Sequence, residues 1–170
     1  MPVLQAISDR RSIREYQPGA VVTDEQLRNM LEAAMMAPSA HDGRPWEFVV
    51  VRDRARLETL RGLHPYADML RTASMAVVVC FTKKAGDTES QSFVPQDCGA
   101  ATENLMLQAA ADGLGTCWCG VHPREPLIEA VRDALDIPKE LTPFNIIAVG
   151  VAAKTPERRG RYEGSKVHYR

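Results

Sequence analysis

The feature that most constrains the fold of this chain is an unbroken apolar run at residues 75–81. Because successive side chains of a strand point to opposite faces, such a run is typical of a central strand that is covered on both sides. Residues 98–112 carry Ala, Leu and Met nearly all round a helix, which indicates a helix buried on most sides. Together these segments predict a layered fold in which helices pack on a sheet, either α+β or α/β, with three layers.

The other elements follow from local signals. Thr23 and Gln26 have the spacing of a capping box, and the helix that they begin carries an apolar stripe and ends before Pro38. Further helices are expected at residues 3–9, 55–61 and 126–135, and further strands at 46–51, 116–121 and 144–151. Residues 84–96 have no apolar period and are expected to form an irregular loop, a small and open lid. At 170 residues, these elements fit a single domain, residues 1–170.

The four cysteines do not form a metal-binding pattern. Cys80, Cys98, Cys117 and Cys119 include no CxxC pair, and no close pair of histidines accompanies them, so we expect no zinc site. Cys117 and Cys119 would face the same side of a strand, either as small half-buried residues or as a redox pair. Reduced cysteines, no signal-peptide pattern and no apolar run near the roughly 20 residues of a membrane span favour a cytoplasmic protein without a membrane partner.

Basic residues gather at the two ends of a chain whose net charge is −1 at pH 7. Arg10, Arg11 and Arg14 lie near the start, and residues 154–170 carry six basic residues against two acidic ones. The near-neutral balance argues against a nucleic-acid partner. Each basic cluster therefore faces solvent or binds a small anion.

Two segments in the first third of the chain could hold a ligand, and each also has an ordinary structural explanation. The segment Arg10-Arg11-Ser12-Ile13-Arg14 could bind phosphate through guanidinium groups and a hydroxyl, or it is a solvated basic turn. Residues 37–46 connect a helix to a strand. The small residues Ser39, Ala40 and Gly43 in that connection would let a flat ligand approach the backbone closely.

Two later segments have the same two interpretations. Residues 113–120 lack the GxGxxG spacing and the Walker lysine, so neither a Rossmann site nor a P-loop is expected. Backbone N–H groups beside the glycines could bond the polar edge of a planar ring, whereas Trp118 alone is more typical of a core. In the tail, Arg159 and Arg161 share one side of an extended chain and could meet one phosphate, or the tail is simply solvated.

In this order, and over nearly the whole chain, the segments resemble the short, minimal members of the nitroreductase family of FMN enzymes. The motifs are Arg-Arg-Ser-Ile-Arg at 10–14, Ala-Pro-Ser-Ala at 37–40 with Pro-Trp-Glu-Phe-Val-Val-Val at 45–51, Asp-Cys-Gly-Ala-Ala at 97–101 with Glu-Asn-Leu at 103–105, Gly-Leu-Gly-Thr-Cys-Trp at 113–118, and the basic tail. The resemblance implies a three-layer α+β fold with a central mixed, mainly antiparallel sheet, and an intertwined homodimer with FMN at the interface. Residues 154–170 would then be a C-terminal extension across the partner subunit.

The resemblance also implies roles for individual residues. Arg10, Ser12 and Arg14 would hold the phosphate, ribityl chain and ring edge of FMN, and Arg11 would contribute its backbone or side chain. Arg159 and Arg161 would reach the phosphate. Pro38, Ser39 and Ala40 would come from the partner chain, and Trp118, Cys119 and Gly120 would lie along the isoalloxazine.

The implied activity is a ping-pong transfer of hydride from NAD(P)H through flavin N5 to nitroaromatic, quinone or similar small acceptors. Positive charge near the N1–C2 edge of the flavin, for which Arg14 is the candidate, would favour reduction. No side chain needs to act as an acid or base. The alternatives are another reaction on the same fold (flavin fragmentation, reductive dehalogenation or azoline oxidation) and a non-enzymatic binder with a basic tail.

The sequence departs from the family pattern after Pro-Ser-Ala. Asp42 and Arg44 stand where the family usually has an amide residue and a glutamine, and with His41 they are candidates for the substrate pocket. They could change substrate preference, or pair with each other and leave the site unchanged. Near Met69, the sequence also has no counterpart of a lysine that longer members place beside the flavin.

Overall fold

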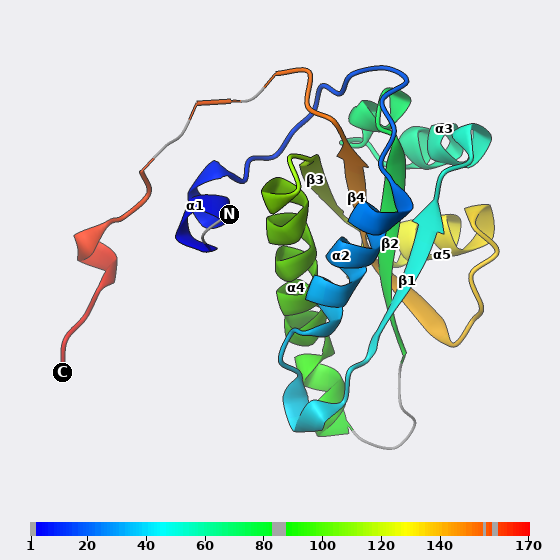
Figure 1. The fold of residues 1–170 in the computed structure, drawn as a ribbon. Coiled ribbons are helices and arrows are strands. Elements are labelled where there is room, and N and C mark those ends of the chain that lie inside the picture. Colours follow the sequence, from blue (N-terminus) through cyan, green and yellow to red (C-terminus); the bar gives the residue numbers. More distant parts are fainter. Residues whose placement is uncertain (1–2, 83–87, 155, 158–159) are drawn as a thin grey trace.

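A four-stranded antiparallel sheet forms the centre of the computed structural model, which describes residues 3–82, 88–154, 156–157 and 160–170 (Figure 1). The strands are β1 (Trp46–Val51), β2 (Met75–Thr82), β3 (Gly115–Gly120) and β4 (Leu141–Gly150), in the order β1-β2-β4-β3. The described residues add one parallel pairing, an isolated bridge between Ser12 and Thr116 beside the edge strand β3. The prediction of a mainly antiparallel sheet is therefore confirmed.

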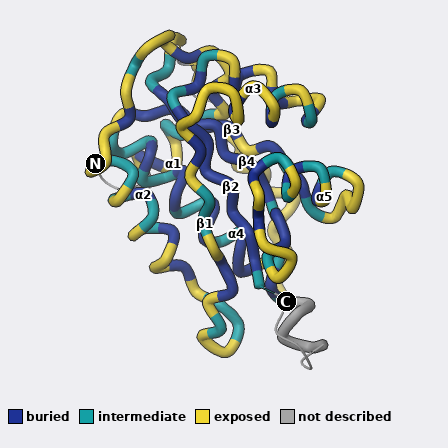
Figure 2. The backbone as a smooth tube through the Cα atoms, turned by 90° about the vertical axis from the view of Figure 1, so that its right-hand side faces the viewer, coloured by how far each residue is buried: buried dark blue, intermediate teal, exposed yellow. Residues whose placement is uncertain are grey.

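Helices cover both faces of this sheet. On one face lie α2 (Asp24–Met35) and α4 (Thr88–Ala111), and on the other lie α3 (Arg54–Leu63), α5 (Glu125–Ala134) and the short 3-10 helix η2 (Asp68–Arg71) (Figure 1). Alternate residues of β2 divide between the two cores: Val77 packs with the α2 and α4 side chains, and Val78 packs with those of α3 and α5. β2 is buried almost throughout (Figure 2). The three-layer α+β fold is confirmed.

The helix α4 begins at Thr88, so the expectation of an irregular loop at residues 84–96 is wrong; residues 83–87 lie outside the description. Pro95 lies inside this helix and cannot donate a backbone hydrogen bond. On either side of it, Val94 and Cys98 are buried in the core shared with α2. Tertiary packing therefore outweighs the local tendency of proline to break the helix. The prediction of a small, open lid depended on an irregular loop at residues 84–96, and the structure has a helix over most of that segment.

Segment 12–17, which follows the N-terminal helix α1 (Val3–Asp9), is fixed along one end of the sheet. The N–H of Ile13 donates to the Thr116 carbonyl at 2.8 Å, and the N–H of Gln17 donates to the Val151 carbonyl at 2.9 Å. A Cβ atom on Gly115 would lie 2.7 Å from Cγ1 of Ile13. Glycine at position 115 is therefore required for the close approach of this segment to β3.

The tail leaves the layered body of the molecule (Figure 1). Its short 3-10 helix η3 (Gly164–Lys166) has no buried residue, and Tyr162 and Tyr169 are 84% and 86% exposed. The end of α2 is also uncovered, because Met35 and Met36 are 53% and 82% exposed. Among the described residues, no helix is long and apolar enough to cross a membrane.

We expect Gly115→Ala to lower the free energy of unfolding by about 1–3 kcal/mol, because the added methyl group collides with Ile13. Urea unfolding followed by circular dichroism measures the change. Gly62→Ala is the matched control: Gly62 lies in α3 with no atom within 4 Å of an added Cβ. There the same substitution should raise stability by about 0.5–1 kcal/mol. Equal effects at both positions would contradict the close-approach argument.

Candidate functional site

Two neighbouring arginines form the most distinctive charge arrangement in the structure. Nε of Arg10 donates to Oε1 of Glu103 on α4 at 2.9 Å, and Nε of Arg11 donates to the backbone carbonyl of Glu157 at 3.1 Å. The latter bond joins the N-terminal arginines to the start of the tail. Nη2 of Arg11 is buried and finds no hydrogen-bond partner in the described part of the chain. A buried unsatisfied cationic N–H is costly, so this atom is suited to an anionic ligand.

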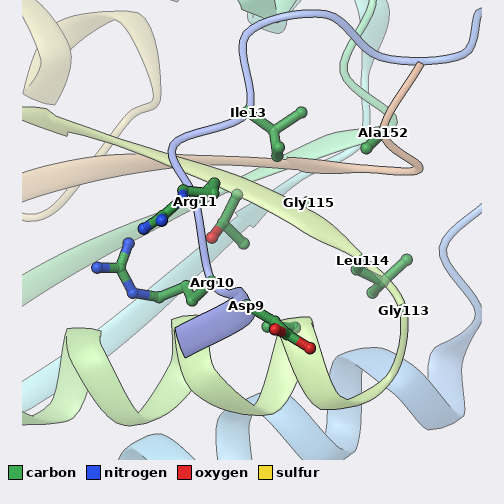
Figure 3. A pocket seen from close by; sticks show the side chains of 10 residues that line it. Asp9, Arg10, Arg11, Ile13, Gly113, Leu114, Gly115 and Ala152 are labelled. Atoms are coloured by element: carbon green, nitrogen blue, oxygen red, sulfur yellow. The ribbon is translucent and has the colours of Figure 1, made fainter. Parts of the chain in front are cut away.

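These arginines line a pocket with a volume of about 160 Å³ between segment 10–13 and the end of α4. Figure 3 shows the Arg10 and Arg11 side chains pointing to the same side, whereas the Asp9 carboxylate points away from them. The remaining lining residues are Ile13, Ala110, Gly113, Leu114, Gly115, Thr116 and Ala152. The pocket therefore offers two guanidinium groups beside a wall of small and apolar residues.

A second pocket, of about 260 Å³, lies where Arg14 meets η2. Arg14 and Tyr16 line it from segment 12–17, and Met69 and Arg71 line it from η2. Residues 68–71 match no ligand-binding motif. Sequence analysis pointed to this part of the chain only through the lysine of longer family members that has no counterpart near Met69. The N-terminal segment thus supplies cations to two adjoining parts of the surface.

Cys117 and Cys119 lie on the same face of β3, as predicted, and are 2% and 3% exposed. Contact with the Cys119 side chain lowers the pKa of Cys117, and the charge of Arg14 acts in the same direction. The same contact and burial both raise the pKa of Cys119. The Cys119 thiol donates to the Tyr66 carbonyl, with a sulfur–oxygen distance of 3.4 Å.

The end of β3 is positioned by a histidine and an arginine that sequence analysis missed. Nδ1 of His64 accepts from the N–H of Tyr66 at 3.1 Å, and Nε2 lies 3.0 Å from the Gly120 carbonyl and 2.9 Å from Nη2 of Arg124. Arg124 donates to the same carbonyl. On the opposite face of the strand, Trp118 is 37% exposed and contacts Phe144 edge-on at 5.8 Å between ring centroids.

The turn after Pro38 has an unusual backbone. His41, Asp42 and Arg44 have φ values of 54°, 52° and 43°, in the left-handed region that non-glycine residues rarely adopt. Asp42 and Arg44 form a two-pronged ion pair with both nitrogen–oxygen distances at 2.7 Å, which lowers the pKa of Asp42. Asp42 and Arg44 therefore pair with each other, as one of the two interpretations expected, and their effect on substrate preference stays a prediction.

This turn is held at a different part of α4 from the arginine pocket. The N–H of Ala40 donates to Oδ1 of Asp97 at 3.1 Å, whereas the pocket is lined by Ala110. At 1.5 Å of rise per residue, Asp97 and Ala110 are about 20 Å apart along the helix axis. Within one chain, the turn therefore does not join the two arginines. Arg161 is exposed and lines neither pocket, and Arg159 lies outside the described residues.

The model of the nitroreductase family matches residues 7–67 and 58–151 of this sequence. The chain belongs to the nitroreductase family. It is 40% identical over 168 residues to the "Putative NADH dehydrogenase/NAD(P)H nitroreductase" of Methanothermobacter thermautotrophicus, covering 99% of this chain and 86% of that protein. A Helicobacter acinonychis protein named "Oxygen-insensitive NADPH nitroreductase" is 32% identical over 92% of this chain and 90% of its own length.

A solved structure shares the fold of this nitroreductase and contains the expected cofactor. It is the crystal structure of "a putative nitroreductase in complex with fmn" from Desulfovibrio desulfuricans, with a TM-score of 0.85 and 34% identity over 100% of this chain and 97% of that one. In the present chain, segment 10–14, β3 and η2 lie together, and the turn at residues 38–40 lies apart from the arginine pocket.

In this nitroreductase we expect the Cys117 thiol to titrate at a lower pH than an ordinary thiol, because contact with Cys119 and the charge of Arg14 lower its pKa. A pH titration of the ultraviolet thiolate band measures the midpoint. Cys117→Ala should remove the step. The matched control is Cys98→Ala, which should leave it in place, because burial raises the pKa of Cys98 to about 12. A step that survives Cys117→Ala would contradict the assignment.

Proposed function

We propose that this nitroreductase is an FMN-dependent oxidoreductase that transfers hydride from NAD(P)H to nitroaromatic, quinone or similar small acceptors. The observation that carries the proposal is the buried Nη2 of Arg11, which has no hydrogen-bond partner among the described residues and lies beside Arg10 at a pocket that opens next to the tail. A phosphate group would accept from both guanidiniums in charge-assisted, two-pronged bonds. The FMN complex of the Desulfovibrio desulfuricans protein supports the choice of FMN among phosphate-bearing ligands.

The proposed site residues form two groups, one at the phosphate of FMN and one at its isoalloxazine ring. Arg10, Arg11 and Ser12 would hold the phosphate and ribityl chain, together with Arg161 and with Arg159, which lies outside the described residues. Arg14 would place its positive charge at the ring edge, in the pocket that it shares with Met69. FMN, when bound, supplies the chemistry of accepting and donating hydride.

Backbone groups of β3 would orient the ring. Trp118, Cys119 and Gly120 would present the strand end to the ring, and His64 and Arg124 fix the Gly120 carbonyl from behind. The guanidinium of Arg14 stabilises negative charge that develops beside it, which favours the reduced state of a bound ring. We assign no side chain as a general acid or base.

We also propose that the active form is a homodimer in which the turn at Pro38, Ser39 and Ala40 completes the site of the partner. Three uncovered parts of the chain support this: the turn held away from the arginine pocket, the exposed end of α2, and the tail with its exposed tyrosines. Residues 154–170 would cross the partner subunit and bury these side chains. His41, Asp42 and Arg44 would then lie at the rim of the substrate pocket.

Purified protein tests the proposed function directly. We expect a yellow protein with one FMN per chain, whose visible flavin absorbance bleaches on addition of NADH or NADPH without oxygen and returns when a nitroaromatic or a quinone is added. A colourless protein that takes up no added FMN would refute the proposal.

We expect Arg10→Ala combined with Arg161→Ala to weaken FMN binding steeply. Each lost charge-assisted bond contributes about 1.5–3 kcal/mol, so each arginine should raise the FMN dissociation constant at least about 10-fold. Arg11→Ala should have a comparable effect. Fluorescence titration measures the constants, and light scattering should still show a species of two chains.

The matched control for these variants is Arg56→Ala. Arg56 forms an exposed ion pair with Asp136, with its guanidinium nitrogen 2.9 Å from the carboxylate and both groups far from segment 10–14 in the sequence. Its removal should leave the FMN dissociation constant unchanged. If the double arginine variant retains FMN as tightly as the control, the phosphate has been placed wrongly.

A further inference from the structure

The two arginines of the pocket beside segment 10–13 are anchored to the protein in the same way. Nε of Arg10 donates to Oε1 of Glu103 at 2.9 Å, and Nε of Arg11 donates to the Glu157 carbonyl at 3.1 Å. A guanidinium carries five N–H groups, and each of these contacts uses the single N–H on Nε. Both contacts therefore leave the Nη atoms for other partners, on side chains that point to the same side (Figure 3).

Glu103 lies on a part of α4 that is fixed on both sides of it. The hydroxyl of Thr102 is fully buried and accepts from Nδ2 of Asn145 at 2.9 Å. The side chain of Asn104 donates to a backbone carbonyl of α2 at 3.1 Å. The carboxylate of Glu103 therefore reaches Arg10 from an anchored turn of the helix.

The ion pair between Arg10 and Glu103 is better shielded from water than a typical surface pair of this chain. The two side chains are 25% and 43% exposed. The side chains of the Arg52–Asp24 pair, by comparison, are 41% and 93% exposed. Because water and salt weaken exposed ion pairs, the contact with Glu103 is the more effective one for holding an arginine in a fixed orientation.

The charge of Glu103 by itself is unfavourable beside a phosphate site, because a carboxylate repels a bound phosphate. An anchoring contact has the opposite effect on phosphate affinity. A free arginine side chain loses rotamer entropy when it binds a ligand, whereas an anchored arginine has lost that entropy before the ligand arrives. The two effects predict opposite results when Glu103 is removed.

We propose that Glu103 is a positioning residue for the phosphate of FMN. By accepting from Nε, it holds the guanidinium of Arg10 so that the Nη atoms meet the phosphate, as the Glu157 carbonyl does for Arg11. Glu103 acts through Arg10 and does not itself touch FMN. This inference rests on the proposed function, because it requires the FMN phosphate to lie at the two arginines.

The test is fluorescence titration of the full-length chain, freed of flavin, with FMN and with riboflavin. Groups that orient a metal ligand contribute about 10- to 100-fold to affinity, and we expect Glu103→Ala to raise the FMN dissociation constant about 10-fold. Glu103→Gln should recover most of that loss, because its amide oxygen still accepts from Nε of Arg10. The affinity for riboflavin, which has no phosphate, should be the same in all three proteins.

A double variant shows whether Glu103 acts through Arg10. When Arg10→Ala is already present, adding Glu103→Ala should not raise the FMN dissociation constant further, because no guanidinium remains to be held. Glu129→Ala is the matched control. Glu129 is a 60% exposed glutamate that pairs with Arg132 on the same helix, α5, and its removal should leave the affinities for FMN and riboflavin unchanged.

Four results would overturn the inference. If Glu103→Ala binds FMN as tightly as the unaltered protein, or more tightly, the carboxylate only competes with the phosphate. If Glu103→Gln is as weak as Glu103→Ala, the hydrogen bond to Nε is not what matters. An equal loss of affinity for riboflavin, or an equal loss when Arg10→Ala is present, would show a general structural role. An unaltered protein that binds no FMN would instead refute the proposed function, and this inference with it.

Discussion

The contact between segment 12–17 and the ends of β3 and β4 supports the whole candidate site. Ile13 packs on Gly115 and Tyr16 packs on Gly150, and in each case the glycine leaves room that a side chain would fill. The backbone bond from Ile13 to Thr116 then holds the segment in register with β3. Arg10, Arg11 and Arg14 extend from this fixed backbone, so their positions relative to the sheet depend on that packing.

The same arrangement leaves positive charge without full compensation. Glu103 pairs with Arg10, but Arg11 directs a buried nitrogen to no partner among the described residues. In a protein that is only marginally stable, such a group is tolerated when a ligand satisfies it in the working state. An anion bound at the proposed phosphate site would therefore stabilise this region of the fold.

The chain alone presents an incomplete site with several surfaces that lack a cover. The strained turn at residues 41–44 is held by Asp97 of α4 and by Ser39 at its own start. Backbone strain of this kind persists where surrounding structure enforces it, and it clusters at functional sites. In the proposed dimer, the turn, the tail and the end of α2 would all be covered by contacts between the two chains.

The sequence by itself determined the layers of the fold and the segments of the candidate site. The apolar run of β2 and the capping box of α2 are local patterns, and local hydrogen bonding and burial decide their structure. These local patterns do not predict contacts between segments that lie far apart in the sequence. The start of α4 at Thr88, the approach of Met69 to Cys119, and the bond from His64 to Gly120 depend on packing between residues that periodicity does not relate. Only the tertiary structure could decide them, because their free energy comes from neighbours brought together after the elements have formed.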